Sequence, residues 1–492
     1  MLSNLISIHL FVPEIALTMG IILLLVWDLA FALKRVAAGA IALSALLCAA
    51  LVTLVTSSGG GQDMFGGLIV RDGFADFFKV FFHLVTGLIV LVSLRAKDTI
   101  DHTDGRDRDA SEFFALLLTL DLGMSLMAAS NDLLMAYLSL EMVSLISYVI
   151  VGFRRRNAAS SEAALKYIIF GGVASGVMLF GLSLLYGMTG ATEFASVRAA
   201  LTTAGQGALA VSVLAVVLIL AGFGYKVAAV PFHMWCPDVY EGAPTPVTAF
   251  LSVGPKAAGF ALLLRFFAVG GGVLPDEGQL LGAPWGLLLG VMAAATMTLG
   301  NLAAILQQNV KRLLAYSSIA HAGYLLMALC VFSRESQQAV LFYLVAYLFM
   351  NLGAFVVVIG LSEAGLGESI SSYRGLGVRA PLVAAIMALF LFSLTGIPPL
   401  AGFIGKFYLF AAVLKKGGAF YVILAIIGVL NSAISLYYYA RILKEMFFNA
   451  AEEKSLVLVP GLHRGVALVL AVPTILLGVY WSPLVDLIGR VL

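Results

Sequence analysis

The stretch of residues 222–256 most constrains what this chain can fold into, and it reads GFGYKVAAVPFHMWCPDVYEGAPTPVTAFLSVGPK. Four prolines lie between two apolar runs, and these runs contain Lys226 and Lys256. Proline lacks a backbone N–H and clashes with the preceding helical turn, so a single helix cannot continue through this segment. The segment therefore predicts two apolar helices that are interrupted by an irregular connection.

The composition places these helices in a membrane. Of the 492 residues, 61% are hydrophobic and only 11% are charged, against about 25% charged residues in soluble domains. At about 20 apolar residues per span, the chain predicts an all-α polytopic membrane protein with about fourteen helices, which start near residues 10, 35, 74, 112, 131, 160, 208, 244, 284, 311, 337, 380, 419 and 463.

Basic residues predict how these helices are oriented. Outside the predicted spans, more than twice as many lysines and arginines fall in one set of alternate loops as in the other. The positive-inside rule then places both termini on the outer, periplasmic side of a cell inner membrane. No small-residue cleavage site precedes Lys34, the first basic residue, so we expect the first helix to be retained. The glycine-flanked loop of residues 58–72 predicts a small hairpin on the outer side.

Two short sequence echoes predict an internal repeat. Residues 222–226 (GFGYK) resemble residues 402–406 (GFIGK), and residues 136–139 (AYLS) resemble residues 315–318 (AYSS). Each pair is five helices apart, and five is odd, so the second copy would cross the membrane in the opposite direction, as in inverted-topology repeats. We therefore expect a three-helix segment at 1–110, repeats at 111–270 and 280–450 with broken helices 7 and 12, and a last helix at 451–492.

Charged residues inside the predicted spans are the candidate functional groups. Glu141 lies ten residues into helix 5 and needs a partner, for which Lys226 or Lys166 is the natural candidate. Burial favours the neutral lysine and a nearby carboxylate favours the charged one, so such a pair suits a proton relay. A structural ion pair is the alternative reading for Glu141 with Lys226, and Lys166 could instead extend to the membrane surface.

Three further groups complete the predicted relay. Lys256 lies near the middle of helix 8 directly after Pro255, and Lys406 lies inside helix 12. A lysine near the bilayer centre costs about 2.5 to 3.5 kcal/mol, which makes it a functional hypothesis by default. His321 lies in mid-span and could link proton steps, although a packing role is the alternative. We interpret Lys79 as a residue that extends to the surface and leave the participation of Asp121 and His233 open.

Several motifs are absent from the sequence. Cys48, Cys236 and Cys330 are isolated and form no CxxC pair, which argues against an iron-sulfur cluster or thiolate metal site. No GxGxxG follows an expected strand, and no phosphate-binding GxxxxGK[ST] motif occurs. No long tract of one charge suggests nucleic-acid binding. We therefore expect no cofactor or metal in this chain, and any redox chemistry would belong to partners.

The run VPFHMWCPDVYEGAPTPVTAFLSVGPKAA, with SLEMVSLISYV before it and GIPPLAGFIGKF after it, resembles the subunit N family of proton-pumping NADH:quinone oxidoreductase, respiratory complex I. The resemblance covers nearly the whole chain and implies a fourteen-helix antiporter-like subunit with two half-channels. It also implies that the proton-relay residues are those of helices 5, 6, 7, 8 and 12, namely Glu141, Lys166, Lys226, Lys256 and Lys406. The related subunit M family usually has a glutamate where this chain has Lys406.

The resemblance implies a function that depends on partners. The chain would move protons as one module of a complex whose other subunits bind NADH, quinone, FMN and iron-sulfur clusters. Its expected neighbours are other membrane subunits, including antiporter-like ones, and the lipid bilayer. Two alternatives stay open, namely a subunit of a multi-subunit sodium/proton antiporter and a structural membrane scaffold in which the buried charges fix helix register.

Overall fold

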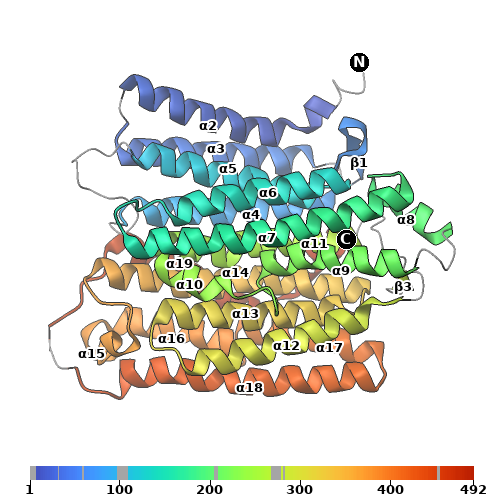
Figure 1. The fold of residues 1–492 in the computed structure, drawn as a ribbon. Coiled ribbons are helices and arrows are strands. Elements are labelled where there is room, and N and C mark those ends of the chain that lie inside the picture. The colour runs from blue at the N-terminus through green and yellow to red at the C-terminus, as the bar shows by residue number, and fades with distance from the viewer. Residues whose placement is uncertain are drawn as a thin grey trace.

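Long helices that lie side by side along a common direction make up most of this chain in a computed structural model (Figure 1). The structure describes residues 7–31, 33–57, 60–96, 109–203, 209–267, 279–280, 283–451 and 455–492. The helices of the first half are α2 (Val12–Phe31), α3 (Arg35–Thr56), α4 (Gly73–Ser93), α5 (Asp109–Ala129), α6 (Leu133–Val151), α7 (Ala158–Thr189), α8 (Phe194–Thr203), α9 (Leu209–Val227), α10 (Trp235–Gly242) and α11 (Thr245–Phe267). Those of the second half are α12 (Trp285–Ile305), α13 (Val310–Leu329), α14 (Arg334–Glu363), α15 (Leu376–Arg379), α16 (Pro381–Thr395), α17 (Ala401–Lys416), α18 (Ala419–Phe447), α19 (Gly461–Val479) and α20 (Ser482–Val491).

The helices confirm a multi-pass membrane protein. Among the described residues, 12 helices are long and apolar enough to span a bilayer. The two other predicted positions are also helical, but α13 is less apolar, and α16 has only 15 residues because the chain breaks before α17. The exact number of fourteen spans, like the four-part division of the chain, therefore stays a prediction.

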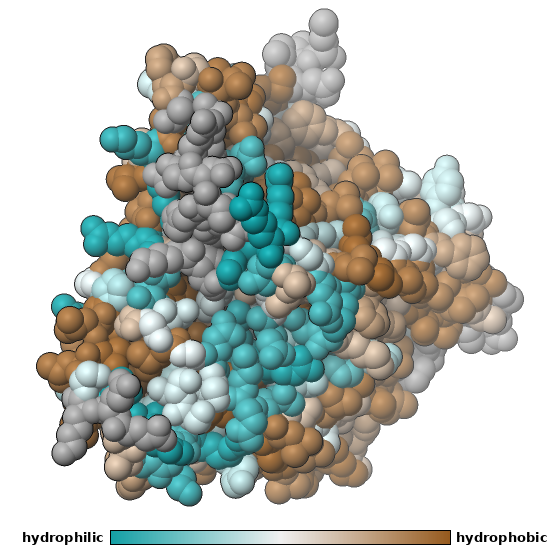
Figure 2. Space-filling view, turned by 60° about the vertical axis from the view of Figure 1, so that its left-hand side comes forward, coloured by the Kyte–Doolittle hydropathy of each residue, from teal (hydrophilic) through white to brown (hydrophobic). Residues whose placement is uncertain are grey.

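Burial separates a core helix from lipid-facing ones. Every residue of α11 is buried, whereas α2 and α18 leave large apolar side chains such as Leu29 and Val429 exposed. Hydrophilic residues gather in a band across the end of the bundle that lies on the left in Figure 1, and apolar surface flanks this band (Figure 2). This distribution is the one that a bilayer around the helices requires.

Glycine permits a close contact between α12 and α13 in the second half. A Cβ added at Gly323 of α13 would lie 2.6 Å from the backbone nitrogen of Met297 in α12, and one at Gly300 would lie 2.7 Å from the backbone nitrogen of Ala320. Any larger side chain at either position would force the two backbones apart. Small residues at such contacts are how helices pack closely in lipid, where the hydrophobic effect does not drive their association.

The same backbone pairing occurs at opposite ends of the bundle. At the start of α6, the N–H of Leu133 donates to Thr192 O at 2.8 Å, and the N–H of Phe194 donates to Asn131 O at 3.0 Å. At the start of α13, Val310 N donates to Glu368 O at 2.8 Å, and Ile370 N donates to Gln308 O at 2.9 Å. The side chains of Asp132 and Asn309 cap these two helices. This pattern supports the predicted inverted repeat.

The pairing also corrects one of the sequence echoes. Counted from the caps Asp132 and Asn309, Glu141 corresponds to Ser318, and Ser144 corresponds to His321. The echo of residues 136–139 in residues 315–318 is two residues out of this register, which on a helix is nearly the opposite face. Four similar letters in an apolar helix were too few to fix the alignment.

The predicted hairpin is confirmed. Strands β1 (Gln62–Met64) and β2 (Ile69–Arg71) pair antiparallel, with Asp63 opposite Val70. A short pair, β3 (Gln279–Leu280) and β4 (Ala283–Pro284), lies before α12. Asn131 N donates to Leu68 O at 3.1 Å and so ties the hairpin to the start of α6. The hairpin lies at the same end of the bundle as the start of α2 and the C-terminus (Figure 1), and we call this end the hairpin end.

Candidate functional site

The first helix break places Lys226 in the interior. Helix α9 ends at Val227, and Ala228 takes a positive φ of 58° before the chain reaches Pro231 and α10. The carbonyl of Tyr225 accepts a hydrogen bond from Trp235 Nε1 at 3.0 Å, which satisfies one of the backbone groups that a helix end leaves free. Lys226 is only 2% exposed. The predicted break and the predicted burial of this lysine are both confirmed.

The second break positions Lys406. Pro398 and Pro399 lack the N–H groups that would bond to Leu394 O and Thr395 O if α16 continued. The ammonium of Lys406, which is carried by α17, donates to these two carbonyls at 3.0 and 2.8 Å. It also donates to Ser432 Oγ at 2.9 Å and lies 4.8 Å from the ring centre of Tyr324. The lysine thus completes the end of the helix that the prolines interrupt.

Lys226 contacts a hydroxyl that lies one helical turn from Glu141. Lys226 Nζ donates to Ser144 Oγ at 3.1 Å, and Ser144 lies one turn after Glu141 on α6. Within the described chain Glu141 forms no ion pair with Lys226 or Lys166, and its buried Oε1 has no hydrogen-bond partner. The structure therefore brings Glu141 and Lys226 to one place but does not pair them directly.

Lys166 lies apart from this pair. Its side chain is 39% exposed and contacts Glu162 Oε1 and Asp238 Oδ2, each at 2.8 Å. Asp238 also accepts from Arg312 at 2.6 Å, and Arg312 reaches Glu241 at 2.7 Å. The prediction that Lys166 could serve as the partner of Glu141 is wrong because a charged network near the surface holds this ammonium. The i, i+4 spacing of Glu162 and Lys166 was the available signal.

Lys256 lies at the centre of the bundle. Its Nζ donates to Ser318 Oγ at 2.6 Å and lies 5.6 Å from the ring centre of Tyr240. Cys236 Sγ lies 3.9 Å from the same Ser318 oxygen. A cavity of about 10 Å³ is lined by Lys256, Ser318 and His321. Its other lining residues are mostly apolar, and this volume is at the lower limit for one water molecule.

His321 is hydrogen-bonded through both ring nitrogens. Nδ1 lies 2.5 Å from Tyr343 Oη, and Nε2 lies 3.4 Å from Tyr439 Oη. Tyr439 in turn bonds to Ser317. The His321 ring lies 5.8 Å from that of Tyr324, which faces Lys406. His321 is thus the intermediate group between the central lysine and the lysine of the second break.

One contact also joins the first half to the centre. Gly259 lies one turn after Lys256 on α11, and a Cβ added there would be 3.2 Å from Lys226 Cγ. The stem of Lys226 therefore lies against the face of α11 that carries Lys256. The groups that the structure arranges in sequence, which we call the lysine chain, are Glu141, Ser144, Lys226, Lys256, Ser318, His321, Tyr324 and Lys406.

His233 does not join the lysine chain by any described hydrogen bond. It is buried, and its Nδ1 has no hydrogen-bond partner among the described residues. The neighbouring acids Asp238 and Glu241 are engaged by Arg312 instead. In the described part of the chain, no group of three or more His, Cys, Asp or Glu residues could hold a metal ion.

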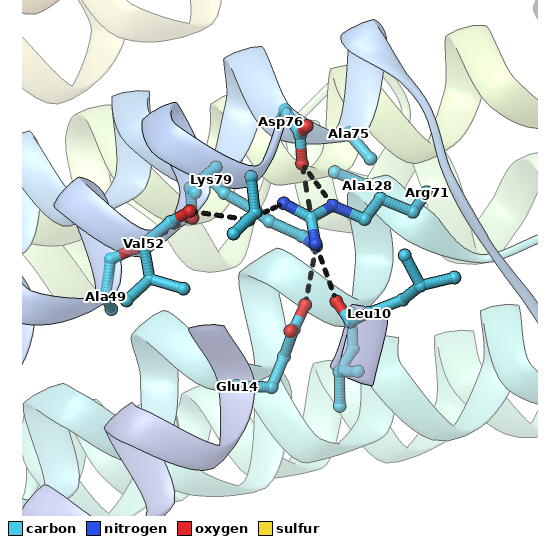
Figure 3. A network of polar contacts seen from close by, with 12 residues as sticks. Leu10, Glu14, Ala49, Val52, Arg71, Ala75, Asp76, Lys79 and Ala128 are labelled. Carbon is cyan, nitrogen blue, oxygen red and sulfur yellow. Dashed lines mark hydrogen bonds and ion pairs between the residues drawn. The ribbon is translucent and has the colours of Figure 1, made fainter. Parts of the chain in front are cut away.

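Sequence reasoning missed a second set of buried charges. Lys79 does not reach the surface, contrary to our prediction, because it is fully buried and its Nζ lies 2.7 Å from Glu14 Oε1 (Figure 3). His83 Nδ1 lies 2.5 Å from Asp121 Oδ2. The signal was present as polar residues spaced four and three apart along residues 72–86. It was overlooked because the glutamate that pairs with Lys79 is far away in sequence.

The broken helices and their buried lysines define a class of membrane transporter-like subunits, and the comparisons agree. The family model described as "NADH:quinone oxidoreductase/Mrp antiporter, TM" matches residues 130–435. The chain belongs to this family, within the group of NADH-quinone oxidoreductase subunit N proteins. It is 52% identical to NADH-quinone oxidoreductase subunit N 2 of Sorangium cellulosum (strain So ce56), over 99% of this chain and 98% of the relative.

Other relatives and solved structures are consistent with this assignment. The subunit N of Anaeromyxobacter sp. (strain Fw109-5) is 50% identical over 98% of this chain and 96% of its own length. A chain of respiratory complex I from Thermus thermophilus superposes with a TM-score of 0.80, at 31% identity over 97% of this chain and 99% of that one. A chain of the Mrp complex from Dietzia sp. DQ12-45-1b shares the fold, with a TM-score of 0.81 at 21% identity over 100% of this chain and 97% of that one.

Proposed function

We propose that this chain is a proton-translocating membrane subunit of an NADH:quinone oxidoreductase. The observation that carries the proposal is the lysine chain, in which three buried ammonium groups each contact a hydroxyl and in which Ser318, His321 and Tyr324 connect Lys256 with Lys406. Two relatives that are 50% and 52% identical are named as subunits of NADH-quinone oxidoreductase, and this supports the assignment to that complex. Electron transfer would occur on FMN and iron-sulfur clusters of partner subunits, which also bind NADH and quinone.

Buried lysines suit proton transfer because their two protonation states can be brought close in free energy. Desolvation disfavours the charged form of a lysine, whereas a nearby carboxylate or a change in hydration favours it. Moving one charge against 100 mV costs about 2.3 kcal/mol, and one pKa unit corresponds to about 1.4 kcal/mol. Modest changes in hydration along the lysine chain would therefore be enough to drive a proton stepwise.

We further propose that the chain lies in the cell inner membrane with its hairpin end, and hence both termini, on the periplasmic side. The arginines of residues 154–156 and the Lys311 to Arg312 pair belong to the opposite end, which fits the positive-inside rule. Antiporter-like subunits of the same complex are the expected neighbours. The assignment of residues 111–270 and 280–450 as two half-channels belongs to this proposal.

The test replaces the central lysine in the intact complex. Lys256→Met keeps the length of the side chain but removes its charge, so we expect proton pumping per NADH oxidised to fall while the complex still assembles. Lys415→Met is the matched control because Lys415 is 70% exposed and pairs with Glu335 at the surface. Both variants are measured in membrane vesicles with a pH-sensitive dye and NADH absorbance.

The rival functions predict other results. A scaffold subunit would leave pumping stoichiometry unchanged in Lys256→Met. A sodium/proton antiporter subunit would exchange sodium for protons without NADH, and the shared fold with a chain of the Mrp complex motivates that measurement. Normal pumping in Lys256→Met would overturn the proposed function.

A further inference from the structure

A polar stripe follows one face of α4, outside the lysine chain. Asp72, Asp76, Lys79, His83 and Thr86 are spaced four, three, four and three residues apart, which places them on the same side of a helix. Asp72 is the N-cap of α4 and lies next to the hairpin. At about 1.5 Å of rise per residue, the stripe reaches about 16 Å inward from Asp72 to His83, roughly half of a 30 Å hydrocarbon core.

Buried ions occupy the outer part of this stripe. Arg71 Nε lies 3.3 Å from Asp76 Oδ1, and Lys79 Nζ lies 4.0 Å from the same oxygen and 2.7 Å from Glu14 Oε1 (Figure 3). At the hairpin end, Arg265 of α11 reaches Asp72 at 2.5 Å. Asp72 is the member nearest to water, with 19% of its side chain exposed. The stripe is therefore accessible from the hairpin end.

The inner part of the stripe is a histidine and carboxylate pair. Asp121 of α5 accepts a hydrogen bond from the hydroxyl of Thr86 at 2.8 Å. Its other carboxylate oxygen lies 2.5 Å from His83 Nδ1. Asp121 is completely buried and His83 is 4% exposed. His83 Nε2 has no hydrogen-bond partner among the described residues. This buried nitrogen is therefore free to bind a proton or to form a hydrogen bond with a water molecule.

The number of acids and bases around this pair leaves one negative charge that a bound proton would neutralise. The stripe and its direct partners contain four carboxylates, on Glu14, Asp72, Asp76 and Asp121, and three strong bases, on Arg71, Lys79 and Arg265. With all of them ionised, the cluster has one excess negative charge, which is costly at this depth. A proton on His83 or on one carboxyl makes the cluster neutral. Histidine is the side chain whose ordinary titration lies nearest to physiological pH.

The stripe is closed toward the opposite side of the membrane. The next positions on the same face, Ile89 and Val90, are completely buried and apolar. Beyond them, Arg35 of α3 and His463 of α19 bond to the carbonyls of Ser93 and Val92 at the far end of α4. One apolar turn thus separates the stripe from these groups, so we expect exchange with water from the hairpin side.

We propose that the α4 stripe is a proton-holding branch that exchanges protons with the hairpin side of the membrane and stores one of them at the His83 to Asp121 pair. Both α4 and α5 pack against α11, the helix that carries Lys256, so the pair and the central lysine are carried by helices in direct contact. The inference rests on the proposed function, because a stored proton has a role only if the lysine chain conducts protons.

The test uses the intact complex in sealed vesicles and sets the pH on each side separately. Pumping by the parent complex should show a step as the pH on the hairpin side is varied, because the pair takes up its proton from that side. His83→Gln and Asp121→Asn should each lose this step. Thr86→Val removes one hydrogen bond to Asp121 but no titratable group, so the step should persist at a displaced midpoint.

The outcomes separate this inference from the proposed function. If His83→Gln assembles and keeps the hairpin-side step, or if all three variants only lower the melting temperature without changing the pH profile, the branch does not exist. If Asp121→Asn fails to assemble, His83→Gln decides the result alone. Loss of pumping in Lys256→Met together with an unchanged profile in His83→Gln would overturn the branch but keep the lysine chain.

Discussion

The missing side chain of Gly259 sets the spacing between two of the buried lysines. A Cβ there would lie 2.9 Å from Val227 Cγ1 and 3.2 Å from Lys226 Cγ. Val227 is the last residue of α9 and lies directly before the chain break at Ala228. The geometry of the lysine chain therefore depends on a position that bears no polar group.

Gly259→Val should displace the stem of Lys226 and lower proton pumping in a complex that still assembles. Overpacking of this kind costs about 1–3 kcal/mol, which a thermal melt of the purified complex should register. Gly172→Val is the control, because a Cβ at Gly172 of α7 meets no atom within 4 Å. Equal pumping in the two variants would show that the position of Lys226 is not critical.

The burial of individual lysines was predictable from the sequence in some cases and not in others. Lys226, Lys256 and Lys406 were predictable as buried because each lies deep in an apolar run beside a proline. The surroundings of Lys166 and Lys79 were not predictable, because their partners Asp238 and Glu14 lie on other helices. Depth within a span can be counted along the sequence, whereas the face of a helix that meets a distant carboxylate is decided by packing.

Among the helices, the short α10 is attached to its neighbours by ion pairs near the surface. Asp238 binds Lys166 of α7 and Arg312 of α13, so the second part of a broken helix is tied to both halves of the molecule. These side chains are about one third exposed, and exposed ion pairs contribute little to stability. The helix breaks themselves were predictable from proline, but this attachment was not.

A double-mutant cycle of Lys166→Met and Asp238→Asn should give a coupling energy of about 0.2–1 kcal/mol in thermal or denaturant unfolding. Solvent screens the pair, so raising the salt concentration should reduce the coupling further. A coupling well above this range at high salt would place Lys166 in a buried functional network rather than in a surface one. Pumping measured on the same variants would then show whether the attachment of α10 matters for transport.

In the whole molecule, the ion pair of Asp72 with Arg265 joins the third membrane helix to the last helix of the first predicted repeat. Burial alone would raise the pKa of the Asp72 carboxyl, but the charge and hydrogen bonds of Arg265 outweigh it, and the pKa of Asp72 lies below its ordinary value. A lowered pKa means that the stabilisation is complete above the unfolded-state pKa of about 3.9 and is lost as the pH falls through the folded value.

Asp72→Asn should therefore lower the stability of the complex at neutral pH, by about 3 kcal/mol, because Arg265 loses its buried partner. It should also remove part of the acid-induced loss of stability below about pH 4. Melting temperatures measured from neutral to acidic pH would check both effects. Asp63→Asn in the exposed strand β1 is the control, and identical melting curves for the two variants would contradict the role of the pair.

The hydrogen bonds of Lys406 connect its charge state to the orientation of a neighbour. An ammonium group has three hydrogens, and here they are directed to Leu394 O, Thr395 O and Ser432 Oγ. A neutral amine has two hydrogens and a lone pair, so it can keep both carbonyls only if Ser432 becomes the donor. The hydroxyl of Ser432 now donates to Thr395 O at 3.0 Å. Departure of a proton from Lys406 would therefore turn the hydroxyl of Ser432 away from that carbonyl and towards the nitrogen.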